Sequence, residues 1–170
     1  MTAHVTVRPE TASDAPSVRE VVLAAFPDVD EADLVDALRA DEEAWIDGLS
    51  WVAVDAAGHL VGHSLLTRCH IGTASALCLA PCSVRPDRQR EGVGTAVTAA
   101  ALKAARRAGE SLVVVLGHPD YYPRFGFERA STHGIRLSIE VPDESLMVLR
   151  LDPGARIPPG LVRYPRAFGI

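Results

Sequence analysis

Hydrophobic and polar residues alternate over His4–Arg8, which predicts a short strand near the N-terminus. The apolar spacing then becomes helical and places four side chains on one face of a first helix: Val18, Val21, Val22 and Ala25. Thr11 and Asp14 have the spacing of a capping box at the start of this helix. A second helix is predicted from Asp30, because acidic side chains favour the positive end of a helix dipole.

The middle of the chain contains three apolar stretches that are typical of strands, at 49–54, from 59 to about 71, and at 76–84. Asp55–Gly58 and Gly72–Ala74 separate them and contain residues typical of tight turns. Pro81 interrupts the third stretch. Because proline has no N–H to donate to a neighbouring strand, we predict a bulge or a local loss of pairing there.

Helical and strand patterns alternate again after residue 90. A helix is predicted from about Gly92 to Ala108, with one side formed by Val93, Val97, Ala100, Ala101 and Ala104. Leu112–Leu116 is continuously apolar, as expected for a strand buried on both faces. A strand, a helix and a strand in this order imply a parallel pair with a right-handed crossover. A short helix at Tyr121–Phe125 and strands near Phe127–Arg129 and Leu146–Leu151 complete a mixed α/β domain.

Composition narrows the class of protein. A length of 170 residues suits one domain with its own core. The formal net charge of −5 argues against general nucleic-acid binding, which needs a basic face. No apolar run approaches the roughly 20 residues that span a bilayer, and Met1–Val5 shows no signal-peptide pattern. We therefore expect a cytoplasmic protein without nucleic-acid or membrane partners, and the sequence leaves open whether it forms a homodimer.

The cysteines and histidines show no metal-binding pattern. Cys69, Cys78 and Cys82 form no CxxC pair, and no HExxH motif occurs among the six histidines. We expect buried core thiols, and we expect His63 and His70 to be structural. No metal is predicted.

The segment Val84–Ala96 carries the strongest functional signal. It joins an apolar strand to a helix through a turn that contains Gly92 and Gly94. The start of a helix presents N–H groups without intrahelical acceptors, and glycine lets a phosphate approach the main chain closely. We therefore predict a diphosphate site here, although an ordinary strand-to-helix turn is the alternative. Three arginines add local positive charge: Arg85, Arg88 and Arg90.

Two motifs resemble those of the GNAT-type N-acetyltransferases. Gln89–Gly94 resembles the Gln/Arg-x-x-Gly-x-Gly/Ala signature of that superfamily, and Tyr122–Phe127 is similar to its Tyr-x-x-x-Gly-Phe element. The resemblance covers about Val5 to Leu151. It implies the GNAT-like acyl-CoA N-acyltransferase fold, with a central, mostly antiparallel sheet and one parallel strand–helix–strand crossover. We expect the GNAT domain over 1–152 and an extended, proline-rich tail packed on it over 153–170.

The resemblance also implies an enzyme that transfers an acetyl group from acetyl-CoA to a primary amine of a small molecule or peptide. The loop expected to hold the diphosphate of coenzyme A consists of Gln89, Arg90, Glu91, Gly92, Val93, Gly94 and Thr95. Gln89 would shape this loop, and Arg88 or Arg90 would reach a phosphate. The pantetheine arm would lie beside Cys82, Ser83 and Val84, where a main-chain N–H would polarise the thioester carbonyl.

Tyr122 occupies the tyrosine position of the second motif and is the predicted catalytic acid. A phenol stays protonated at neutral pH and can donate to a departing thiolate. Tyr121 is the expected structural neighbour, although the sequence does not exclude swapped roles. The general base stays open among four residues: Asp30, Glu31, His118 and Asp120.

Two features leave room for other interpretations. Many family members carry an asparagine after the fifth strand, whereas this chain reads Gly117–Asp120, so the resemblance does not carry cofactor contacts to this turn. One alternative function is a non-catalytic acyl-CoA-binding or regulatory module of the same fold. A Rossmann-type nucleotide-binding protein is disfavoured, because the Gly92–Gly94 segment lacks the third glycine of that fingerprint.

Overall fold

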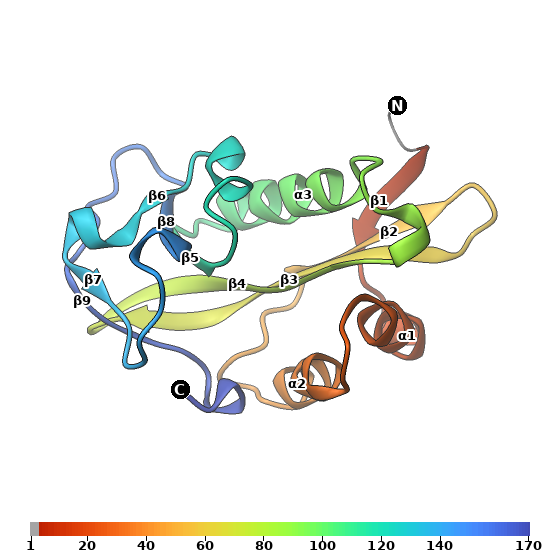
Figure 1. The fold of residues 1–170 in the computed structure, drawn as a ribbon, viewed down its shortest axis with the longest axis horizontal. Helices are drawn as coiled ribbons and strands as arrows, with labels where there is room; N and C mark the ends of the chain where they lie inside the picture. Colours follow the sequence, from red (N-terminus) through yellow and green to blue (C-terminus); the bar gives the residue numbers. More distant parts are fainter. Residues whose placement is uncertain (1–3) are drawn as a thin grey trace.

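The computed structural model describes residues 4–170 and builds them around a nine-stranded sheet (Figure 1). The signal-peptide expectation and the predicted domain start depend in part on residues 1–3, which lie outside the described residues. The helices are α1 (Ala15–Ala25), α2 (Asp30–Arg39) and α3 (Val93–Arg107). The strands are β1 (Val5–Pro9), β2 (Ser50–Asp55), β3 (Leu60–Ile71), β4 (Ala74–Val84), β5 (Leu112–Leu116), β6 (Glu128–Arg129), β7 (Ile135–Arg136), β8 (Leu146–Arg150) and β9 (Gly160–Arg163).

The strands follow the order β1-β2-β3-β4-β5-β8-β6 across the sheet. Neighbours on this path are antiparallel except β4 and β5, which are parallel and are connected through α3. The predicted mixed sheet with a parallel crossover is therefore confirmed. β9 pairs with the end of β3 and, in parallel, with the two-residue strand β7. The sequence patterns predicted neither β7 nor β9.

Helix α3 covers one face of the sheet, and α1 and α2 cover the other (Figure 1). The buried stripe of α3 repeats every four residues and consists of Val93, Val97, Ala101 and Ala105. Thr98 and Leu102 are also buried, whereas Ala100 and Ala104 are only partly buried. The contact face is thus rotated from the predicted one. None of the helices over residues 4–170 combines the length and the apolar character that crossing a membrane requires.

A buried carboxylate fixes the connection between β1 and α1. The predicted capping box forms a 3₁₀ turn, and α1 begins directly after it at Ala15. The Asp14 carboxylate accepts hydrogen bonds from the N–H of Thr11 and from Nη1 of Arg8, each at 2.7 Å. The hydrogen bond from Arg8 is the main reason why the pKa of Asp14 falls to about 2. The carboxylate is therefore charged at neutral pH and links strand to helix.

The middle of β4 contains the irregularity predicted from its proline. The register between β3 and β4 shifts between Ser64 and Leu66, opposite the segment that contains Pro81. Two β4 residues there face one β3 residue, which is the geometry of a bulge. The predicted bulge is confirmed, and pairing between β3 and β4 resumes beyond it.

Strand β5 lies beside β4 over only a short distance. Residues 77–78 of β4 pair with residues 113–114 of β5, although β4 continues to Val84. β5 remains paired with β8 over 112–116. The edge of β4 over residues 79–84 consequently has β3 on one side and no strand on the other. We call this unpaired edge the slot.

The C-terminal segment contributes β9 to the sheet edge. It then turns through Arg166–Phe168, below the sheet as drawn in Figure 1. The rings of Tyr164 and Phe168 lie 4.9 Å apart, and both pack against buried core residues. Residues 153–159 contain no regular element.

Candidate functional site

The start of α3 offers main-chain hydrogen-bond donors. Gly92 precedes the helix in a left-handed conformation, with φ +86°. The N–H groups of the first helical residues, Val93 to Thr95, have no intrahelical acceptor, and no side chain caps the helix. Arg90 is also left-handed, with φ +65°, at a cost of about 1 kcal/mol for a non-glycine residue. Left-handed residues of this kind are typical of loops whose N–H groups converge on an anion.

Side chains hold the predicted cofactor loop, Gln89–Thr95, in different ways. Gln89 Nε2 donates to the carbonyl of Val84 at 3.3 Å and ties the loop to the end of β4. Arg88 Nε donates to the Glu91 carboxylate at 2.9 Å. Arg90 is exposed and has no ion-pair partner within residues 4–170. Of the two arginines expected to reach a phosphate, Arg90 therefore has the free guanidinium.

Main-chain groups of β4 line the slot. The N–H of Arg85 donates to β3 at 2.9 Å. Because successive N–H groups of a strand point to opposite sides, those of Cys82 and Val84 point away from β3, toward the slot. The Cys82 thiol lies 3.2 Å from the Thr98 hydroxyl of α3. Ser83 is buried on the opposite face, and its hydroxyl has no partner within the described chain.

Tyr122 begins the 3₁₀ turn η3 (Tyr122–Phe125), which follows β5. Its ring packs against the core beneath α3 and lies 5.9 Å from the ring of Phe127. A Cβ on Gly117 would stand 2.4 Å from Cε2 of this ring, so the position of Tyr122 depends on a glycine at the end of β5. Burial raises the pKa of the Tyr122 phenol, which is therefore protonated at neutral pH.

Tyr121 connects η3 to the start of α3. Its hydroxyl lies 3.0 Å from that of Thr95, and its ring stands 5.0 Å from the ring of Tyr122. The Arg124 guanidinium covers the Tyr121 ring at 4.1 Å. No sequence pattern predicts this contact, because Tyr121 and Thr95 are 26 residues apart and belong to different motifs.

The four candidates for the general base lie in two places. Asp30 and Glu31 begin α2, on the face opposite α3, and Oε2 of Glu31 is buried without a partner in the described chain. His118 and Asp120 are exposed in the turn after β5. The carbonyl of His118 accepts a hydrogen bond from the N–H of Tyr121 at 3.1 Å. The structure thus brings only the second pair next to η3.

His63, Cys69 and Cys78 lie in the core, as predicted, whereas His70, which was also expected to be structural, is partly buried and lines a cavity. His63 is fully buried, with Nε2 at 2.8 Å from the Ser50 hydroxyl, and burial lowers its pKa to about 3. Cys69 and Cys78 are buried, whereas Cys82 is partly buried. Within residues 4–170, no three His, Cys, Asp or Glu side chains gather in a way that could hold a metal ion.

A free helix start, a loop with left-handed residues and an unpaired strand edge thus occur together. Residues 6–130 match the family described as the acetyltransferase (GNAT) domain. This chain belongs to the GNAT acetyltransferase family. It is 38% identical over 146 residues to the uncharacterised N-acetyltransferase YjhQ of Escherichia coli K12, an alignment that covers 83% of this chain and 80% of YjhQ.

Solved structures show the same architecture for this acetyltransferase. Escherichia coli YhbS in complex with CoA superposes with a TM-score of 0.89 at 27% identity, covering 100% of this chain and 94% of YhbS. A GNAT family acetyltransferase from Brucella melitensis in complex with acetyl-CoA gives a TM-score of 0.79 at 33% identity, covering 97% and 98%. The resemblance inferred from the two motifs, the fold and the enzyme class are therefore confirmed.

Proposed function

We propose that this acetyltransferase transfers an acetyl group from acetyl-CoA to a primary amine of a small molecule or peptide. One observation carries the proposal: the free N–H groups at the start of α3 adjoin the slot along β4. A Cβ on Gly94 would stand 3.2 Å from Cγ2 of Val84 and 3.5 Å from the Tyr121 hydroxyl. The first turn of α3, the end of β4 and η3 therefore meet at one place.

The residues present fit the diphosphate of coenzyme A. The N–H groups of Val93 to Thr95 supply donors at the positive end of α3. Arg90 supplies an unpaired guanidinium, and Gln89 anchors the loop to β4. Because Gly94 has no Cβ, the space between the first turn of α3, Val84 and Tyr121 stays open to a ligand. CoA and acetyl-CoA are the ligands in the two similar structures.

The slot fits an extended pantetheine arm. The N–H groups of Cys82 and Val84 point into it, so the arm can pair with β4 as an added strand would. Ser83, between them, points its N–H toward β3, and its side chain is buried on the other face. Of the three residues predicted beside the pantetheine arm, Cys82 and Val84 therefore offer main-chain contacts, and Ser83 does not.

Acetyl-CoA supplies the activated thioester. The N–H of Cys82 is aimed at the slot and donates a hydrogen bond to the thioester oxygen as negative charge develops on it. Tyr122 holds a proton on its phenol, since burial disfavours the phenolate, and donates it to the departing sulfur. The amine nitrogen attacks the carbonyl carbon directly and loses a proton to solvent or to a base. His118 and Asp120 are the base candidates beside η3.

Tyr121 and Tyr122 receive different roles. Tyr121 holds η3 against α3 through Thr95, with 3.0 Å between the hydroxyl oxygens. The Tyr122 hydroxyl makes no such bond within residues 4–170 and is free to donate. A non-catalytic acyl-CoA-binding module would use the same loop and slot but would not need Tyr122.

The test begins with isothermal titration of the protein with acetyl-CoA, with NAD as the control ligand. We expect one-to-one binding of acetyl-CoA alone, followed by release of free thiol when a panel of primary amines is added. Tyr122→Phe should lower kcat about 100-fold, the lower end of the usual effect of a general acid, with little change in the Kd of acetyl-CoA.

The matched variant is Tyr121→Phe, which should leave kcat within about tenfold, since it removes one hydrogen bond. A folded protein that does not bind acetyl-CoA would contradict the proposal. Binding without thiol release for every amine class would favour the non-catalytic module instead.

A further inference from the structure

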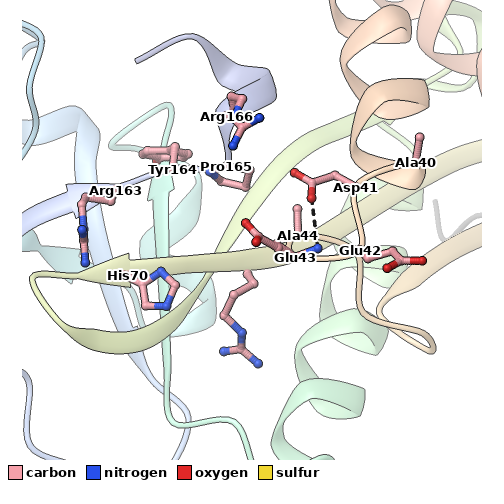
Figure 2. A pocket seen from close by; sticks show the side chains of 11 residues that line it. Ala40, Asp41, Glu42, Glu43, Ala44, His70, Arg163, Tyr164, Pro165 and Arg166 are labelled. Carbon is pink, nitrogen blue, oxygen red and sulfur yellow. Dashed lines mark hydrogen bonds between the residues drawn. The ribbon is translucent and has the colours of Figure 1, made fainter.

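A charged cavity of about 630 Å³ lies beside the last residues of β3, and Figure 2 shows the side chains that line it. It is bordered by the connection between α2 and β2, by the last residues of β3 and by the segment that follows β9. These elements lie at the end of β4 where the strand begins, whereas the cofactor loop follows its other end. No residue predicted to bind the cofactor lines this cavity.

The two walls of the charged cavity carry opposite charge. Asp41, Glu42 and Glu43 form an acidic wall on the α2–β2 connection. Arg163 and Arg166 form a basic wall around Tyr164 and Pro165. Figure 2 shows Asp41 and Glu43 on one side and Arg163 on the other, with Arg166 at the top. A ligand that fits both walls therefore needs a positive and a negative group.

These charges are not neutralised within the described chain. Arg68, which also lines the cavity, pairs with Glu110. Neither Arg163 nor Arg166 has an ion-pair partner among residues 4–170, and neither do the three acids of the opposite wall. Arg163 Nη2 donates only to a main-chain carbonyl, that of Gly72, at 2.8 Å. Full charges are thus available to a ligand on both sides.

Main-chain hydrogen bonds hold the walls in place. The N–H of Arg68 donates to the carbonyl of Ala44 at 2.9 Å and fixes the acidic connection to β3. Within that connection, the N–H of Glu43 donates to Oδ1 of Asp41 at 3.0 Å. On the basic side, Arg163 is paired with His70 in the β3–β9 ladder. The gap between the walls is therefore part of the fold.

From this arrangement we infer that the charged cavity binds a short peptide with a free amino group and a free carboxylate. An arginine fork recognises a carboxylate with two parallel hydrogen bonds, and carboxylates accept hydrogen bonds from an ammonium group. An extended tripeptide spans about 10 Å between its charged ends. The cavity volume, about 630 Å³, lies in the range typical of small-molecule sites. The site is separate from the transfer reaction and does not depend on the proposed function.

Triglycine is the probe, titrated calorimetrically into the protein without acetyl-CoA, so that no acetylation takes place. We expect one-to-one binding of triglycine. N-acetyl-triglycine and triglycine amide, which each lack one terminal charge, should bind at least about fivefold more weakly. Triglycine that gives no heat up to about 10 mM, or capped peptides that bind as well as triglycine, would overturn the inference.

Variants locate the site. Arg166→Gln and Glu43→Gln should each weaken triglycine binding about fivefold to tenfold, because each removes one charged partner. Both residues lie on the surface, so the variants should fold. Arg156→Gln, an exposed arginine outside the cavity lining, is the matched control and should bind triglycine like the unaltered protein. Equal affinity in all three variants would place the peptide elsewhere and overturn the inference.

Discussion

Strand β4 has a paired strand on each side at Leu77 and Cys78, in its first half, and on one side only in its second half. Leu77 and Cys78 lie between β3 and β5 and are fully buried. Beyond the bulge at Pro81, Cys82 and Val84 keep β3 as their neighbour and turn their other main-chain groups toward the slot. One strand thus contributes to the core and then to the candidate site.

The first half of β4 thus serves the stability of the fold, and the second half serves the candidate site. The first half is stabilised by apolar burial, and its backbone donors and acceptors are used by neighbouring strands. The second half leaves main-chain donors free, which a ligand can use without disturbing the core. Changes in the two halves should therefore have different consequences.

The largest expected effect comes from Leu77→Ala in the first half. Removing this fully buried side chain should lower the free energy of unfolding by about 3 kcal/mol, from lost burial and a residual cavity. Urea unfolding measures it. Cys82→Ala in the second half is the matched change and should cost less than about 1.5 kcal/mol. An equal loss of unfolding free energy in the two variants would contradict the different roles of the two halves of β4.

Asp14→Asn tests a stabilising contact outside both halves. The pKa of Asp14 is about 2 in the folded protein, against a usual value of 3.8. Because the pKa of Asp14 is lower in the folded protein, the charged carboxylate adds about 2 kcal/mol to the free energy of unfolding. This contribution is complete above pH 4 and is lost as the pH falls toward 2. Urea unfolding between pH 2 and 7 should show this dependence weakened in the variant. Acetyl-CoA binding at pH 7 should not change; an equally acid-sensitive variant would count against the Arg8–Asp14 contact.

Gly117→Ala alters the site without touching β4. The added Cβ would meet the Tyr122 ring at 2.4 Å, so the ring must shift from its position. We expect kcat to fall about tenfold, since a displaced catalytic group loses alignment. Gly154→Ala, where the nearest atom is 3.5 Å from the new Cβ, is the control. Unchanged turnover in Gly117→Ala would argue against Tyr122 as the acid.

The smallest expected effect concerns the bond between Tyr121 and Thr95. Tyr121→Phe and Thr95→Val each remove one side of it and should raise the Kd of acetyl-CoA about threefold, in line with one hydrogen bond. The double variant should be scarcely weaker than either single one, because both remove the same bond. Fully additive effects in titration calorimetry would show that the two hydroxyls act independently.

The sequence predicted those parts of the fold whose signals are local. The apolar patterns identified α1 to α3, β1 to β5, β6 and β8, and Pro81 identified the bulge. Strands β7 and β9, of two and four residues, have too few residues for a pattern and exist only through pairing with distant segments.

In the candidate site, too, the sequence predicted the local features and not the contacts between distant segments. The motif around Gly92 and Gly94 indicated the free helix start, whereas the contact between Tyr121 and Thr95 depends on how η3 docks against α3. The charged cavity had no sequence signal at all, since its walls come from segments near residues 42 and 165. Charges so far apart in sequence become neighbours only through the fold.

Hydrogen exchange of main-chain amides with and without coenzyme A tests the central claim most directly. We expect added protection at Cys82 and Val84 and over residues 90–95, where N–H groups are free to bind the cofactor, and no change at Leu77 and Cys78, which have a paired strand on each side. Protection confined to other regions, or spread equally along β4, would contradict the assignment of the slot and the start of α3 as the cofactor site.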